Sequence, residues 1–215
     1  MTRDTLIKYF NKNTALEIGG PSQLLEPYYS GINDLTLFNH RSSMSVHSQG
    51  AINHNIIFGD ATNNDDFKQL NGSKFDLIIL SHTFEHIANP IKALKIWVEL
   101  LNNSGTIINI VPDKNYCWDR SRAYTEYNHI IDDYTSNTSE NDLTHLEESS
   151  CMLETRPTYY SDVGTDNENR IIHHHVYSKS VLEQVHKAAG FRTIECDNIS
   201  TDPLQLIYIG EYYYE

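Results

Sequence analysis

The chain has 215 residues, 39% of them hydrophobic, and its 29 acidic residues against 16 Lys and Arg give a formal net charge of −13. This length fits one domain with a sizeable core, which we place over residues 1–215. The acidic balance disfavours nucleic acid as a partner, because proteins that bind phosphate backbones need a basic face.

The cysteines and the apolar runs indicate in which cellular compartment the protein is expected. The three cysteines, Cys117, Cys151 and Cys196, lie far apart and form no CxxC pair, which suits a reducing environment. The first residues, "MTRDTLIKYFNKN", lack the apolar core of a signal peptide, and no apolar run approaches the roughly 20 residues that span a bilayer. We therefore expect a cytoplasmic protein that does not enter a membrane.

Short apolar runs alternate with helical stretches along the first half of the chain. The runs predicted as strands are Thr14–Ile18, Leu35–Phe38, Asn55–Phe58, Phe75–Ser81 and Thr106–Val111. Between the last two, "PIKALKIWVELLNN" begins at Pro90 and predicts a helix with Trp97 in the core, which "SG" at 104–105 would end.

The texture becomes polar from Pro112 to about Arg170, where charged residues, Asn, Ser and Tyr dominate. Regularity returns with "SKSVLEQVHKAAGF", a predicted helix in which Ser180 and Glu183 form a capping box and Gly190 ends the helix. "RTIECD" and "LQLIYIGEYYY" then read as two closing strands. We expect residues 112–170 to be an insertion after the fifth strand that covers the substrate as a lid.

Alternation of buried strands and helices predicts an α/β fold with a parallel, doubly wound sheet, and the two closing strands indicate an antiparallel strand at one end. In such sheets ligands bind beyond the carboxyl ends of the strands. The segments "GGPS", "GDA", "SHTFEH" and "VPDK" all follow predicted strands. The sequence therefore predicts a ligand site built from four loops.

The first of these loops suits a ligand held against backbone. Gly19 and Gly20 permit a tight turn and close approach, and a helix start after them offers free N–H groups. An ordinary turn has the same residues. The GxGxxG pattern of nicotinamide-dependent oxidoreductases is absent, which makes that class the less favoured reading.

The order of the loops resembles that of class I S-adenosylmethionine-dependent methyltransferases, from about Thr14 to the C-terminus. The resemblance implies a Rossmann-like methyltransferase fold, a mostly parallel seven-stranded sheet with helices on both faces. It implies S-adenosylmethionine as the cofactor. The residues that it places at the cofactor are Glu17, Gly19, Gly20, Ser22, Asn39, Asp60, Ala61 and Ser81. The chain departs from the family pattern in having Pro21 or Ser22 for a later glycine and Asn39 for the ribose-binding acid.

A narrower resemblance covers the polar segment. "LEIGGPS", "SHTFEHIANPIKAL", "VPDKNYCWDRSR", "NDLTHLEE" and "HHHVYSKSVLEQVHKAAGF" look like motifs of stand-alone methyltransferases associated with bacterial surface-polysaccharide synthesis. This resemblance implies methyl transfer to an oxygen of a sugar, a nucleotide-sugar or a related glycan precursor. The expected partner is such a small molecule, and the oligomeric state is left open.

A sugar hydroxyl is a poor nucleophile while protonated, so a base or a metal usually assists its methylation. The candidate bases are His82, His175 and His145. A helix starting near Thr83 would bring His82, Glu85 and His86 within one turn. This pattern resembles the "E-x-x-E-H" metal motif of some methyltransferases, with His82 for the first acid.

The "HHH" tripeptide extends this hypothesis. In an extended chain His173 and His175 point to one side, and with the HxxEH motif they form a metal set suited to Zn, Mn, Fe or Ni. The residues of this set are Glu85, His86, His173 and His175. The alternatives are histidines that pack near the cofactor without metal, that form a wall against the substrate, or that are merely solvated.

Residues after the fifth strand are candidates for the rim of the acceptor pocket. We expect Asp113, Tyr116, Arg120 and His173 to contact the substrate, and Tyr116, Trp118 and Tyr124 to offer faces for a sugar ring. Arg120 and Arg122 suit an anion clamp or, equally, an ion-pair network. Two other functions stay open: a metal-dependent methyltransferase of small phenolic or quinone-type acceptors, and a non-catalytic cofactor-binding partner subunit.

Overall fold

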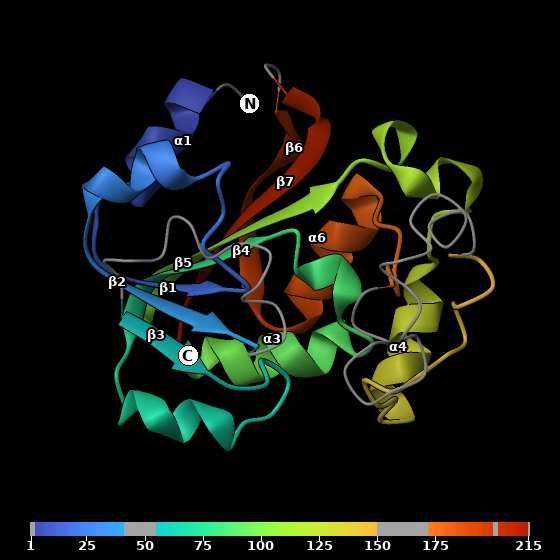
Figure 1. Ribbon diagram of the computed structural model, residues 1–215, viewed down its shortest axis with the longest axis horizontal. Helices are drawn as coiled ribbons and strands as arrows, with labels where there is room; N and C mark the ends of the chain where they lie inside the picture. The colour runs from blue at the N-terminus through green and yellow to red at the C-terminus, as the bar shows by residue number, and fades with distance from the viewer. Residues whose placement is uncertain (1–2, 41–54, 150–171, 200–201, 215) are drawn as a thin grey trace.

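A computed structural model describes residues 3–40, 55–149, 172–199 and 202–214. Its seven strands form one sheet in the order β3-β2-β1-β4-β5-β7-β6 (Figure 1). The strands are β1 Lys12–Ile18, β2 Ile32–Asn39, β3 Asn55–Phe58, β4 Phe75–Ser81, β5 Leu101–Pro112, β6 Phe191–Ile199 and β7 Asp202–Tyr212. β7 pairs antiparallel with both β5 and β6, and every other pair is parallel. The mostly parallel seven-stranded sheet is confirmed, and its antiparallel strand lies one place in from the edge.

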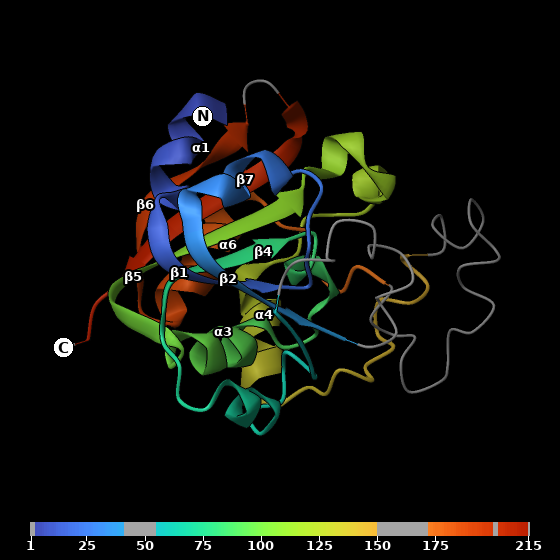
Figure 2. The ribbon, with the colours of Figure 1, turned by 60° about the vertical axis from the view of Figure 1, so that its left-hand side comes forward.

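Helices cover both faces of this sheet, as predicted (Figure 2). One face packs against α3 Pro90–Val98, α4 Tyr127–Thr135 and α6 Lys179–Ala188. The other face packs against α1 Arg3–Phe10 and the short 3-10 helix η1 Glu26–Gly31. The buried strands alternate their side chains between the two cores, because successive residues of a strand point to opposite faces.

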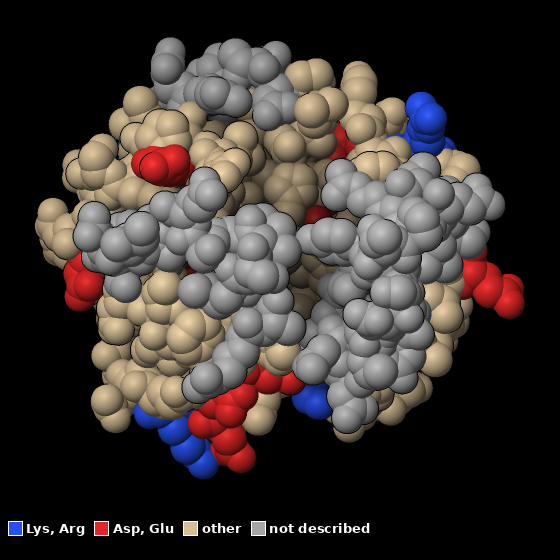
Figure 3. All heavy atoms as spheres, in the orientation of Figure 1, with Lys and Arg blue, Asp and Glu red and all other residues tan. Residues whose placement is uncertain are grey.

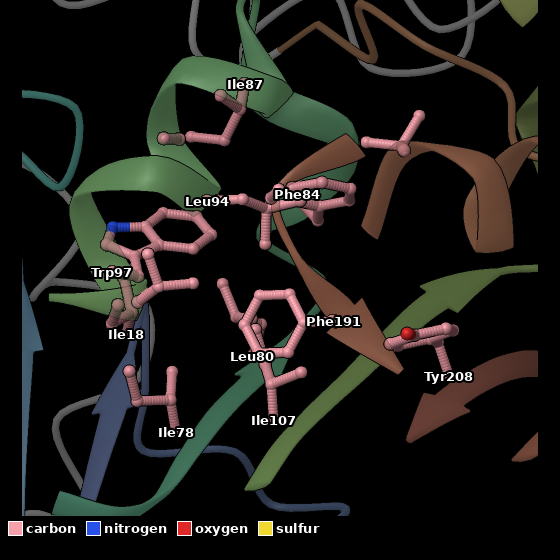
Figure 4. Packing of buried hydrophobic residues seen from close by; sticks show 14 of the residues in the cluster. Ile18, Ile78, Leu80, Phe84, Ile87, Leu94, Trp97, Ile107, Phe191 and Tyr208 are labelled. Carbon is pink, nitrogen blue, oxygen red and sulfur yellow. The ribbon is translucent and has the colours of Figure 1, made fainter. Parts of the chain in front are cut away.

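The larger core lies between the sheet and α3 and α6 (Figure 4). Trp97 of α3 is fully buried there, as predicted, and its Nε1 donates a hydrogen bond of 2.8 Å to the Ala61 carbonyl. Phe84, from the loop after β4, stacks on Tyr177 with ring centroids 5.2 Å apart. This core therefore anchors the loops after β3 and β4, which both belong to the predicted ligand site.

Three predicted boundaries are wrong for local reasons. β5 begins at Leu101 instead of Thr106, because Leu101 already pairs with Phe75 and the register then shifts so that Leu77 pairs with Thr106. The "SG" at 104–105 thus lies in an irregular part of the strand and does not end α3. The N-cap of α6 is Ser178, whose side chain accepts from the Val181 N–H, and not Ser180.

The polar segment after β5 begins with the 3-10 helices η5 Lys114–Tyr116 and η6 Trp118–Ser121 and continues into α4, which packs against α3 and α6. Residues 150–170 of the predicted lid, and with them Cys151, lie outside the described residues. Cys117 and Cys196 are free thiols. In the described part of the chain, no helix is both long and apolar enough to span a membrane.

Candidate functional site

The loop after β1 meets the loop after β4. Gly19 has a φ of +86°, and a Cβ on it would lie 2.1 Å from Thr83 Oγ1. The Thr83 hydroxyl donates to the Ile18 carbonyl at 3.1 Å, and Gly19 N–H donates to the Phe38 carbonyl at 2.9 Å. Only a glycine fits this left-handed position against a side chain. The loop with the predicted cofactor residues therefore touches the start of "HTFEH".

Glu17 holds this loop through hydrogen bonds to its carboxylate. Its side chain is fully buried, and its carboxylate accepts from the Ser22 N–H at 3.0 Å and from the Tyr29 hydroxyl at 2.6 Å. Burial raises the pKa of Glu17 to about 7, against the lowering effect of these two donors. A Cβ on Gly20 would lie 2.2 Å from the Glu17 carboxyl carbon. The turn thus closes directly over a carboxyl group that titrates near neutrality.

The remaining predicted cofactor residues lie along the same edge of the sheet. Asn39 is buried at the end of β2, where its Nδ2 donates to the Gly20 carbonyl at 2.5 Å. The Ser22 hydroxyl donates to the Ser81 hydroxyl at 3.0 Å. Asp60 follows β3 and accepts from the N–H and the hydroxyl of Thr62 at 2.8 and 2.7 Å. The residues lie together as expected, and their role at the cofactor stays a prediction.

The "HTFEH" stretch is a tight turn and not the start of a helix. His82 has a φ of +52° and Phe84–His86 form one 3-10 turn, η4. The turn directs Phe84 into the core, whereas Glu85 and His86 lie beside His173 of the segment before α6. The predicted convergence of Glu85 and His86 thus arises from the irregular turn.

Glu85, His86 and His173, which we call the Glu85 cluster, each offer a ligand atom within 4.8 Å of the others. His86 Nδ1 is 3.0 Å from the Ile172 carbonyl and His173 Nδ1 is 2.5 Å from Asp119 Oδ2. Both acceptors require the hydrogen on Nδ1, so in each neutral ring Nε2 carries the lone pair. This is the arrangement in which histidines bind metals, with the second ring nitrogen held by a carbonyl or a carboxylate.

The carboxylate of the cluster is buried and ionised. Neither oxygen of Glu85 has a hydrogen-bond partner among the described residues, and Oε1 lies 3.4 Å from His82 Nδ1, an ion-pair contact when His82 is protonated. Burial raises the pKa of Glu85, but the contact with His82 and the charges of His86 and His173 lower it to about 2. Burial and the charge of His173 lower the pKa of His86 to about 4. A buried carboxylate next to two imidazole rings fits a divalent cation.

Asp119 and Arg122 support this cluster from behind. Burial raises the pKa of Asp119, but His173 and Arg122 lower it to about 2. Arg122 is buried, and its Nη1 donates to Asp119 Oδ1 and to the His173 carbonyl, each at 2.8 Å. The anion clamp considered for Arg120 and Arg122 is therefore wrong for Arg122, because its guanidinium is held inside the protein. Arg120 is exposed.

His175 does not join the Glu85 cluster, so the predicted four-residue metal set is wrong in this respect. His175 lies with His129 and His145, and ligand atoms of these three rings lie within 4.8 Å of one another. The prediction assumed a regular extended chain. In the structure the N–H groups of His174 and His175 both point at the Glu85 carbonyl, at 2.8 and 3.4 Å, so the alternation of sides is lost.

The other predicted substrate residues lie after β5. Asp113 caps η5 through Asn115 N–H at 2.9 Å and accepts from Asn198 Nδ2 at 2.8 Å. Tyr116 is 57% exposed and Trp118 is 40% exposed. On the face seen in Figure 3, the few Lys and Arg side chains lie near the outline and gather into no basic patch. Contact of these residues with a substrate stays a prediction.

Sequence reasoning missed Tyr29, Thr83 and the pairing of Asp133 with His129. Tyr29 and Thr83 gave no signal, because their contacts depend on how the loops meet. His129 and Asp133 did give one, since residues four apart share a face of a helix. In the structure His129 Nε2 lies 3.3 Å from Asp133 Oδ2.

The chain belongs to the methyltransferase domain family, whose sequence profile matches residues 24–196. No curated protein matches the chain in sequence.

Three solved structures illustrate the similarity in fold. A S-adenosylmethionine-dependent methyltransferase from Clostridium acetobutylicum is 11% identical with a TM-score of 0.58, over 98% of this chain and 89% of that one. The CurJ carbon methyltransferase is 12% identical with a TM-score of 0.55, over 95% and 50%. An O-methyltransferase family protein from Burkholderia thailandensis is 10% identical with a TM-score of 0.54, over 98% and 55%.

The chain thus spans about half the length of the latter two proteins. At these identities the similarity shows the Rossmann-like methyltransferase fold. The proteins with this fold methylate different atoms, since carbon and oxygen methyltransferases both occur among them.

Proposed function

We propose that the protein is a S-adenosylmethionine-dependent methyltransferase that methylates a hydroxyl oxygen of a sugar, a nucleotide-sugar or a related surface-glycan precursor. The observation that carries this proposal is the contact between the Gly19 turn and Thr83. It brings the loop after β1 next to His82 and Glu85, so a methyl donor held by that loop would lie beside a base at one sheet edge. Exposed Tyr116 and Trp118, after β5, supply aromatic faces on which a sugar ring can stack.

His82 is the proposed base. Glu85 Oε1 lies 3.4 Å from its Nδ1 and favours a hydrogen there, so that Nε2 carries the lone pair. Bound S-adenosylmethionine would supply the methyl group, and His82 would take up the proton that the acceptor hydroxyl loses. Glu85 then stabilises the imidazolium next to it. Most of the rate comes from placing the oxygen in line with the methyl group.

The Glu85 cluster fits a divalent metal, because it combines a buried carboxylate without hydrogen bonds and two imidazoles with their Nδ1 hydrogens fixed. Glu85, His86 and His173 would hold the ion. A bound metal would supply an electrophile that binds acceptor oxygens and lowers the pKa of a hydroxyl. Asp119, through His173 Nδ1, keeps the ring oriented for this role.

The first test is a thermal-shift titration with S-adenosylmethionine and S-adenosylhomocysteine, each with and without divalent metal and chelator. We expect a saturable rise in melting temperature, since a ligand at 100 times its Kd adds about 2.7 kcal/mol of stability. Absence of a shift with both compounds refutes cofactor binding.

The acceptor is tested with radiolabelled S-adenosylmethionine and a panel of sugars, nucleotide-sugars and catechols. Transfer to a sugar hydroxyl supports the proposal. Transfer to catechols alone favours the phenolic acceptor, which the Glu85 cluster also suits because two neighbouring oxygens can bind one metal. Cofactor binding without transfer to any compound, together with a stable protein partner, favours the non-catalytic subunit.

A further inference from the structure

A second group of imidazoles lies where the polar segment after β5 meets the segment before α6, and it has no part in the proposed methyl transfer. His129 comes from α4, His145 from the turns that follow it, and His175 from the segment before α6. We call these residues the three-histidine cluster. His129 Nε2 and His145 Nε2 lie 2.9 Å apart. Three segments that are separate in the sequence thus meet through their histidine side chains.

Not every ring nitrogen of this cluster has a hydrogen-bond partner among the described residues. His175 Nε2 is 3.1 Å from the Ala88 carbonyl, so it carries the hydrogen, and the lone pair is on Nδ1. His175 Nδ1 is buried and has no hydrogen-bond partner among the described residues. Of the two facing nitrogens of His129 and His145, only one can carry a hydrogen toward the other. A cation would be bound by one nitrogen of each ring, since the three rings offer ligand atoms within 4.8 Å of one another.

A carboxylate lies beside the rings. Asp133 Oδ2 is 3.3 Å from His129 Nε2 and 3.8 Å from His175 Nε2, and it has no hydrogen-bond partner in the described part of the chain. The other oxygen, Oδ1, accepts from the Thr138 hydroxyl at 3.1 Å, which orients the group. The side chain of Asp133 is 13% exposed, so its charge needs a nearby positive partner.

Burial favours the neutral form of two of the three histidines. Burial and the charge of His129 lower the pKa of His145, and burial lowers the pKa of His175 well below its usual value. A neutral imidazole has a lone pair for a metal, whereas a protonated one has none.

We propose that His129, His145 and His175 bind one divalent transition metal ion, with Asp133 as the balancing charge, and that this ion fastens the polar segment to the methyltransferase core. Three nitrogen ligands favour Zn²⁺ and similar ions over Mg²⁺ and Ca²⁺, which prefer oxygen. Nitrogens bound to tetrahedral Zn²⁺ at 2.0–2.1 Å lie about 3.3 Å apart. The 2.9 Å between His129 and His145 therefore needs to widen by only about 0.4 Å.

The position of the cluster explains why a bound ion would stabilise this part of the fold. The segment 172–178 carries His173 of the Glu85 cluster and His175 of the three-histidine cluster, two residues apart. The Ala88 carbonyl that His175 binds lies two residues after His86. An ion bound by the three histidines would thus fix α4 and the segment 172–178 against the loop that forms the acceptor site.

The experiment uses the full chain without an affinity tag, in the His86→Ala background, so that the Glu85 cluster does not contribute a second ion. Zn²⁺ content is measured by elemental analysis after dialysis, and Co²⁺ is titrated while its visible absorption is followed. We expect one ion per chain and the intense absorption of tetrahedral Co²⁺. Adding His129→Ala or His145→Ala should weaken Co²⁺ binding at least about tenfold, in line with the loss of a ligand.

His40→Ala in the same background is the matched control, because it removes a histidine outside both clusters and should leave the stoichiometry at one. His129 is the decisive position, since its side chain is 36% exposed and its removal leaves the core intact. Far-UV circular dichroism in chelator checks that each variant is folded. Uptake of no ion by the His86→Ala protein, or unchanged binding after His129→Ala, overturns the proposal and identifies a hydrogen-bonded imidazole network. Both outcomes are independent of whether methyl transfer is found.

Discussion

Replacing Glu17 with Gln should change how the stability of the protein depends on pH. Glu17 is fully buried beneath the Gly20 turn, and burial raises its pKa from 4.5 to about 7. Gln has the same shape and no charge. Its oxygen can accept from the Ser22 N–H, and its NH₂ group can donate to the Tyr29 hydroxyl, which can turn to the Ser22 carbonyl at 3.1 Å.

The size and sign of the effect follow from linkage. A carboxyl whose pKa is higher in the folded state binds more protons there, so the folded state loses stability as the pH rises. The loss begins near the unfolded value of 4.5 and is complete above about 7. A difference of 2.5 pKa units (7 − 4.5) at 1.36 kcal/mol per unit gives about 3 kcal/mol, an order-of-magnitude value.

The assay is urea unfolding of the wild type and Glu17→Gln at several pH values between 4.5 and 8.5. We expect the free energy of unfolding of the variant, relative to that of the wild type, to rise by about 3 kcal/mol over this range. Most of this change should occur below pH 7.5. Asp34→Asn, which removes an exposed carboxylate on the neighbouring strand, controls for the general change in net charge. If the free energies of unfolding of wild type and Glu17→Gln run parallel across the range, the reasoning about a buried, proton-binding Glu17 is refuted.

Three further substitutions test the site. Gly20→Ala places a methyl group 2.2 Å from the Glu17 carboxyl carbon, so we expect a loss of about 1–3 kcal/mol of stability in urea unfolding. Calorimetry should show at least about tenfold weaker S-adenosylmethionine binding. Unchanged binding would mean that the turn does not face the cofactor. His82→Ala should lower kcat by about 10²- to 10⁴-fold and leave the Kd for S-adenosylmethionine unaltered, and wild-type turnover would remove His82 from the mechanism. Trp97→Phe loses the hydrogen bond to the Ala61 carbonyl and should cost about 1–3 kcal/mol in urea unfolding, whereas a neutral result would show that the loop after β3 does not depend on this anchor.

The sheet could be predicted because its signal is local. Runs such as Phe75–Ser81 are buried on both faces, so hydrophobicity alone marks them, and chain order then orders the ligand loops. The start of β5 could not be predicted in this way. Asn102, Asn103 and Ser104 read as the end of a helix, but Leu101 already pairs with Phe75 across a register shift.

The candidate site was predictable only where its residues follow strands. The loops after β1, β3 and β4 meet at one edge because parallel strands end together, so Gly19, Asp60 and His82 needed no knowledge of packing. The histidines of 173–175 do not follow a strand, so the order of the strands does not predict where they lie. Their directions depend on the Glu85 carbonyl, which receives two successive N–H groups of the segment, and no periodicity encodes such a contact.

A buried ion pair links the polar segment to the segment before α6. Arg122 joins Asp119 of η6, the carbonyl of His173 and, at 3.4 Å, Glu148 Oε2, and so links three stretches of chain. A buried guanidinium with fixed donors is not equivalent to a lysine, because an ammonium cannot bind several acceptors in one plane. Removing it would leave Asp119 buried without its cation, and breaking such a pair costs about 3–5 kcal/mol. Since Asp119 also orients His173, the order of the segment and the geometry of the Glu85 cluster depend on the same ion pair.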